Sequence, residues 1–140
     1  MYKGMNFYRL LSVVVAAALS LFAAAGQSRA PQTPEEKEKQ LLDMVDNEVQ
    51  RLSGLLKLED WQEFYVDSTL THDFKAMMEE METLQRSKVE NPDLYVAARD
   101  KWMQQISDTY RKFFTPEQWN KFWKSGEKKD QAARDKRKQK

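Results

Sequence analysis

Apolar residues recur at intervals of three and four along most of this 140-residue chain, and this spacing constrains the fold more than any other feature. Such spacing places the apolar side chains on one face of an α-helix. No stretch of useful length alternates apolar with polar residues, as a half-buried strand would. Glycine and proline are scarce, with four of each, which disfavours a turn-rich sandwich. We therefore expect an all-α fold with no sheet, built as a hairpin-like bundle of three to four helices.

Capping residues followed by proline mark where three of these helices begin. Thr33-Pro34, Asn91-Pro92 and Thr115-Pro116 each place a good N-cap before a residue that suits the first helical position. We expect one helix from Pro34 to a break near residues 54–58, a second over about 59–87, a third from Pro92 and a short fourth from Pro116 to Gly126.

Aromatic residues are distributed unevenly among these helices. All twelve that follow residue 26 lie between Trp61 and Trp123, and the first expected helix has none. We therefore expect the second, third and fourth helices to build the core, with Trp61, Phe64 and Tyr65 on the apolar stripe of the second helix. The first helix, whose stripe is aliphatic, either caps that core or pairs with another chain.

Residues 1–26 indicate an export signal. Two basic residues, Lys3 and Arg9, precede an uncharged run of sixteen residues at 10–25, and small residues through Gly26 suit a signal peptidase. A retained membrane anchor is the alternative, but the run is shorter than the roughly 18–20 residues that span a bilayer. We expect a periplasmic protein with a linker at 27–33, a helical domain at 34–126 and a charged tail at 127–140.

The chain contains no cysteine, which limits both its chemistry and its attachment. A disulfide framework, a thiolate metal site and a thiol nucleophile are excluded. A lipid anchor on an N-terminal cysteine is excluded too, so we expect the exported protein to be soluble. A domain of this size without disulfides depends on helix packing for its stability.

The near-zero net charge of the chain conceals an acidic body and a basic tail. Residues 27–123 carry 13 Lys and Arg against 19 Asp and Glu, whereas residues 124–140 carry 8 against 3. For the tail we expect an anionic envelope surface or an acidic protein as the target, and not nucleic acid, which an exported protein rarely meets. A solvated tail, or one that docks on the protein's own acidic body, is the open alternative.

The residues offer no catalytic set, so we expect a protein that is not an enzyme and uses no cofactor or metal. His72 is the only histidine and lies in the middle of an expected helix, without a glycine-rich elbow that could form an oxyanion hole. The acidic residues near it are spaced as on a solvated helix face.

Two groups of large apolar residues are candidates for binding other proteins. Clustered methionines adapt to irregular partners, and large aromatic side chains serve as anchors. The alternative for both groups is that they fill the helical core. The candidates are Met77, Met78 and Met81 on the second helix and Trp119, Phe122 and Trp123 on the fourth.

A helix-start pattern occurs twice, in Leu58-Glu59-Asp60-Trp61-Gln62 and in Phe114-Thr115-Pro116-Glu117-Gln118. In both, an apolar residue is followed by three variable positions and a glutamine. Thr115 and Gln118 also form a capping box, in which each side chain satisfies a backbone N–H of the other residue. We expect Leu58, Gln62, Thr115 and Gln118 to define the two helix starts.

This repeat resembles the Leu-Thr-x-x-Gln motif of the Spy/CpxP family of small helical periplasmic proteins. Glu59 stands in place of the first threonine and Phe114 in place of the second leucine. The resemblance implies a helical hairpin-like subunit, often a cradle-shaped dimer, that holds unfolded envelope proteins without ATP or senses envelope stress. The family's cradle is commonly basic, whereas the body of this chain is acidic.

Together these observations favour an exported, non-enzymatic helical protein that binds other proteins and has a chaperone-like or stress-related role, with a homodimer among the expected assemblies. The second hypothesis is structural: a dimeric helical adaptor that docks on the cell envelope through its basic C-terminal tail.

Overall fold

The computed structural model describes residues 31–139. The elements in chain order are α2 (Pro34–Leu56), α3 (Asp60–Arg86), α4 (Pro92–Phe113), α5 (Pro116–Phe122), the turn η1 (Trp123–Glu127), which is kinked at Gly126, and α6 (Lys128–Lys138). Residues 31–139 contain no strand, so the expected all-α fold is confirmed. The predicted export signal at 1–26 and most of the predicted linker lie outside the described residues.

Helix boundaries follow the capping residues. Within residues 31–38, the Thr33 hydroxyl accepts a hydrogen bond from the Glu36 N–H (3.2 Å), and the Glu36 carboxylate accepts one from the Thr33 N–H (3.0 Å). Asn91 caps α4 by accepting from the Asp93 N–H (3.0 Å). The predicted break after the first helix is confirmed, because α2 ends at Leu56 and Lys57 has a φ of 51°.

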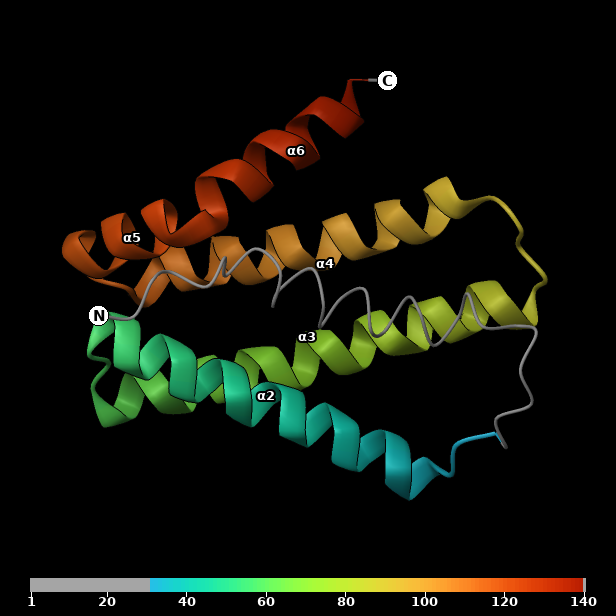
Figure 1. Cartoon of the computed structure of the whole chain (residues 1–140), viewed down its shortest axis with the longest axis horizontal. Helices are drawn as coiled ribbons and strands as arrows, with labels where there is room; N and C mark the ends of the chain where they lie inside the picture. Colours follow the sequence, from blue (N-terminus) through green and yellow to red (C-terminus); the bar gives the residue numbers. More distant parts are fainter. Residues whose placement is uncertain (1–30, 140) are drawn as a thin grey trace, which may run out of the picture. The chain divides into compact units, whose positions relative to one another are not determined.

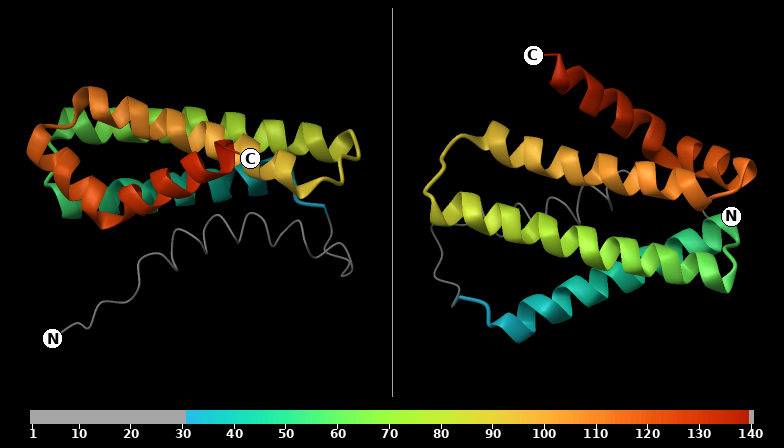
Figure 2. Two further views of the ribbon diagram at one scale, coloured as in Figure 1. Left: turned by 90° about the horizontal axis from the view of Figure 1, so that it is seen from above. Right: turned by 180° about the vertical axis from the view of Figure 1, so that it is seen from behind.

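The packing described below concerns the compact unit Lys39–Lys140. Figure 1 shows α3 and α4 as an antiparallel hairpin, with α6 returning along α4 after the turn at the end of α5. Seen from behind in Figure 2, the same order of α3, α4 and α6 is kept. The turn between α2 and α3 and the turn between α4 and α5 meet at one end of this hairpin.

The core includes the first helix, which was expected either to cap a core built by the later helices or to pair with another chain. Leucine and valine from α2 are buried together with aliphatic residues of α3 and with aromatic rings of α4 and α5, so α2 fills the space that these rings leave. The buried cluster consists of Leu41, Val45, Leu52, Leu56, Val66, Leu70, Ile106, Tyr110, Phe114 and Phe122.

Two glutamines, which we call the glutamine clamp, join the turns before α3 and α5. The Gln62 amide nitrogen donates to the Gln118 side-chain oxygen (2.7 Å), and the Gln118 nitrogen donates to the Gln62 oxygen (2.9 Å). Each oxygen also accepts from the backbone N–H at its own helix start, at Glu59 and at Thr115 (3.0 Å each). The clamp therefore closes two capping boxes against each other.

The remaining N–H of each clamp residue reaches the last turn of a neighbouring helix. Gln62 donates to the Phe113 carbonyl (3.2 Å), and Gln118 donates to the Leu56 carbonyl (3.5 Å). Gln62 is only 1% exposed. Its polar atoms thus leave water without losing hydrogen bonds, which removes most of the cost of burying them.

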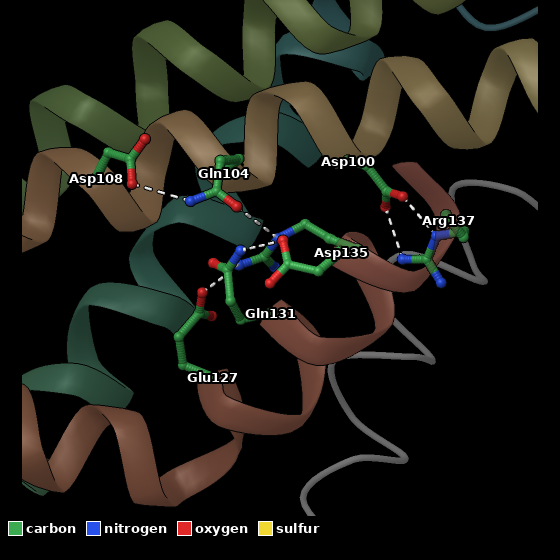
Figure 3. A network of polar contacts seen from close by, with 8 residues as sticks. Asp100, Gln104, Asp108, Glu127, Gln131, Asp135 and Arg137 are labelled. Atoms are coloured by element: carbon green, nitrogen blue, oxygen red, sulfur yellow. Dashed lines mark hydrogen bonds and ion pairs between the residues drawn. The ribbon is translucent and has the colours of Figure 1, made fainter. Parts of the chain in front are cut away.

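The basic C-terminal segment is a helix that packs on the body. Figure 3 shows the polar network between α4 and α6. Arg137 donates to both oxygens of Asp100 on α4 (2.5 and 2.9 Å), and Arg134 donates to the side chain of Gln104 (3.2 Å). Arg134 also pairs with Glu127, and these two residues are 3% and 7% exposed. The tail thus docks on the protein's own body, which was one of the alternatives expected for it.

The pKa values of the two buried carboxyl groups in this network, Asp100 and Glu127, are shifted in opposite directions. Burial opposes ionisation of Asp100, but hydrogen bonds from Arg137 and Arg99 outweigh it and hold the pKa of Asp100 below its usual value. For Glu127, burial outweighs the attraction of Arg134 and raises the pKa of the carboxyl group. The contact with Asp100 therefore favours a docked α6 at neutral pH.

The clamp predicts strong coupling between its two residues. Replacing Gln62 with Ala leaves buried polar groups without partners, so the free energy of unfolding should fall by about 2–3 kcal/mol. Gln118→Ala should have a similar but smaller effect, and the double variant should lose at least about 1 kcal/mol less than the sum. Urea unfolding of the four proteins measures this. Gln50→Ala, which removes an exposed helix glutamine, is the control and should change stability by less than about 0.5 kcal/mol. If the loss of stability in the double variant equalled the sum of the losses in the two single variants, Gln62 and Gln118 would not be coupled and the clamp would be contradicted.

Asp100 predicts a pH dependence of stability. Its folded-state pKa lies below the ordinary value of 3.8, so its contribution is complete above pH 3.8 and is lost as the pH falls through the folded-state value. Asp100→Asn should lower the free energy of unfolding by about 1–3 kcal/mol at pH 7. The difference from the unmodified protein should shrink below pH 3.8. Denaturant unfolding at several pH values tests this, and Asp135→Asn, at an exposed position, is the control. If the stability difference between Asp100→Asn and the unmodified protein grew as the pH fell, the predicted direction of the pH dependence would be wrong.

Candidate protein-binding surface

Three large aromatic side chains are exposed on the first two turns of α3. Trp61 is 47%, Phe64 67% and Tyr65 52% exposed. Their rings are in edge-to-face contact, at 6.0 Å between Trp61 and Tyr65 and 5.9 Å between Phe64 and Tyr65. Phe113, at the end of α4, lies 6.3 Å from the Trp61 ring and 5.7 Å from the Tyr65 ring. We call these four residues the aromatic patch.

The register of α3 explains why these rings face solvent. The inward stripe of this helix runs through Gln62, Val66 and Leu70, which follow one another every four residues and are buried. Residues 61, 64 and 65 therefore fall outside the stripe. The Trp61 indole nitrogen donates to the Glu59 carboxylate (2.6 Å), which orients the ring at the surface.

The aromatic patch rests on the core through Phe113. The Phe113 ring contacts Tyr110 (5.9 Å) and Phe114 (5.0 Å), and both of these contact Phe122 in the core. A side chain supported from below by packed rings loses little conformational freedom when a partner covers it. The patch therefore combines exposure with rigidity.

The six residues that the sequence singled out for protein binding have different surroundings. Met81 and Phe122 are each 8% exposed, and so have a packing role. Met78 and Trp119 pack against the core, and the Trp119 ring is also covered by the Arg111 guanidinium group at 5.2 Å. Met77 and Trp123 are half-buried. The three methionines occupy the second half of α3, whereas the three rings belong to α5 and η1.

Sequence reasoning missed the aromatic patch because it assigned Trp61, Phe64 and Tyr65 to the inward stripe of the helix. The inward positions here include two polar residues, Gln62 and Asp73. If only apolar residues are used to locate the inward face of α3, the predicted face is therefore rotated about the helix axis relative to the observed one. The i, i+4 series through Val66 and Leu70 is the signal that finds the correct face.

His72 is an exposed side chain whose ring nitrogen lies 2.7 Å from the carboxylate of Asp73. Asp73 is buried and also accepts a hydrogen bond from Gln105 (3.0 Å), which places it in a structural contact between α3 and α4. Among residues 31–139, no group of three or more potential ligands is arranged to hold a metal ion.

Comparisons with known proteins give no relative. No protein-family model matches the sequence, and neither the curated proteins nor the solved structures compared with it give a significant match. Within the part of the chain that the structure describes, no helix combines the length and the apolar character needed to cross a membrane.

The exposure of the patch predicts different costs for two phenylalanine substitutions. Phe64→Gln should change the free energy of unfolding by less than about 0.5 kcal/mol, because the ring buries little surface in the folded protein. Phe122→Ala, in the core, should cost about 3–5 kcal/mol. Urea unfolding monitored by far-UV circular dichroism compares the two. A Phe64 substitution as costly as the Phe122 substitution would show that the patch is needed for folding.

Proposed function

We propose that this protein is an exported, periplasmic helical protein that binds other proteins in partly unfolded states, without catalysis and in the manner of a chaperone. The observation that carries this proposal is the aromatic patch. Contiguous exposed apolar patches are uncommon on soluble monomeric proteins, and where they occur they usually mark an interaction site.

The chemistry of the patch suits non-native proteins. Unfolded segments expose apolar side chains, and aromatic rings offer a large contact area at a low entropic cost. Exposed charged residues adjoin the patch in the sequence of the same helices, at Asp60 before Trp61 on α3 and at Lys112 before Phe113 on α4. Such charged neighbours keep the protein soluble and permit release of a bound segment.

The glutamine clamp supports the resemblance to the Spy/CpxP family. Gln62 and Gln118 are the glutamines of the two repeated motifs, and each has the same role at its own helix start. We propose that the chain is a distant relative of that family, with its aromatic patch in place of a basic cradle. The predicted export signal supports the proposed periplasmic location.

Suppression of aggregation is the direct test of this function. In several-fold molar excess, the purified protein should reduce the light scattering of a chemically denatured client during dilution. The triple variant Trp61→Gln, Phe64→Gln, Tyr65→Gln should lose most of this effect because it removes the exposed rings. Leu42→Gln together with Leu94→Gln is the matched control, since these leucines are also exposed but lie on other helices.

Two outcomes would contradict the proposal. One is a lack of suppression by the unmodified protein at any excess. The other is an equal loss of suppression in the triple variant and in the leucine control, which would mean that general surface hydrophobicity, and not the aromatic patch, is responsible. Circular dichroism of each variant establishes that it is folded.

A further inference from the structure

The basic residues of the C-terminal segment are sorted by type in the folded protein. Both arginines of α6 point to the body, where Arg137 pairs with Asp100 and Arg134 pairs with Glu127. The lysines of this segment are exposed, and by helical spacing those of α6 lie on its outer and lateral sides, where the exposed Asp135 also lies. We use the name lysine face for Lys124 of η1 and Lys128, Lys136 and Lys138 of α6.

The lysine face is held in place by the contacts of the arginines. Arg137 makes two hydrogen bonds to Asp100, and Arg134 bonds to Gln104, so two points along α6 are attached to α4. Figure 3 shows the attachment of Arg137 to Asp100, between α6 and α4. Among residues 31–139, no carboxylate forms an ion pair with any of the four lysines. The positive charge is therefore displayed from a folded helix and not from a free tail.

The composition of this face distinguishes between possible partners. The centres of protein–protein interfaces are enriched in aromatic residues and arginine and depleted of lysine. Here the arginines are turned inward, and α6 carries no apolar side chain larger than Ala132 and Ala133. Lysines on flexible stems act as hydrated point charges, which match a fluid array of anionic head groups better than a fixed protein surface.

We propose that the lysine face binds the surface of an anionic lipid bilayer by electrostatic attraction, without inserting side chains into the bilayer. The contact is peripheral, because α6 has no apolar face that could enter the acyl region. It is also reversible and weakened by salt, because exposed charges are screened within about 10 Å at 0.1 M ionic strength. This inference does not depend on the aromatic patch or on the proposed binding of unfolded proteins.

Flotation of lipid vesicles tests the proposal. The unmodified protein and all variants are expressed from the full sequence in the same host and purified in the same way. Any processing by the host is therefore common to all of them. It should float with vesicles of phosphatidylglycerol and phosphatidylcholine in equal parts, but much less with vesicles of phosphatidylcholine alone. Binding should fall steeply from low to high NaCl. Replacing all four lysines of the face with Gln should weaken binding by more than about a hundredfold, since each lysine near such a surface contributes about fivefold.

A charge-matched control separates the lysine face from net charge. Lys57, Lys75, Lys88 and Lys112 are exposed on other elements, and replacing these four with Gln lowers the net charge by the same amount. This control should weaken binding by less than about fivefold. Equal losses in the two variants would overturn the proposal, as would binding to both kinds of vesicle alike. Binding to an acidic protein with no binding to anionic vesicles would also overturn it and would identify a protein as the partner.

Discussion

The hydrogen-bonded pair of Gln62 and Gln118 is the interaction on which the arrangement of the helices depends. These residues are 56 positions apart, yet each completes the N-terminal cap of its own helix while it binds the other. The pair also holds the end of α2 and the end of α4 through their carbonyl groups. The same bonds position the aromatic patch, because Trp61 precedes Gln62 and the carbonyl that Gln62 binds belongs to Phe113.

Polar groups inside the bundle are stable there because almost all of them are hydrogen-bonded. Gln62, Asp73 and Glu127 each have partners on another element or on the same helix. The Tyr110 hydroxyl is the exception among the described residues, being buried without a hydrogen-bond partner. Burial raises the pKa of Tyr110 well above its usual value, so the ring stays neutral. Its stacking on Phe114 at 5.0 Å and its other ring contacts compensate for part of the lost hydration.

Local signals in the sequence predicted the helices, whereas their assembly required the structure. The threonine and asparagine caps and the prolines after them predict helix starts because capping is decided within four residues. A glutamine three residues after a cap indicates the same local role and gives no sign of a partner 56 positions away. Because Gln62 and Asp73 occupy inward positions, Trp61, Phe64 and Tyr65 lie outside the buried face that their spacing predicted, and the aromatic patch was not found. The aliphatic stripe of α2 gave no indication of whether another chain or the protein's own core would cover it.

The turn at Gly126 has a consequence for the surface charge of the protein. Gly126 adopts a φ of 154°, in the region that residues with a Cβ rarely occupy, and the chain kinks there before α6 begins. Since one residue rotates a helix by about 100°, the length of this turn sets which side of α6 meets α4. With one residue fewer in this turn, Lys138 would take the position of Arg137 beside Asp100, and Asp135 would take the position of Arg134. Which basic residues face solvent at this end of the molecule thus depends on the rotation of α6 about its axis as much as on the number of basic residues.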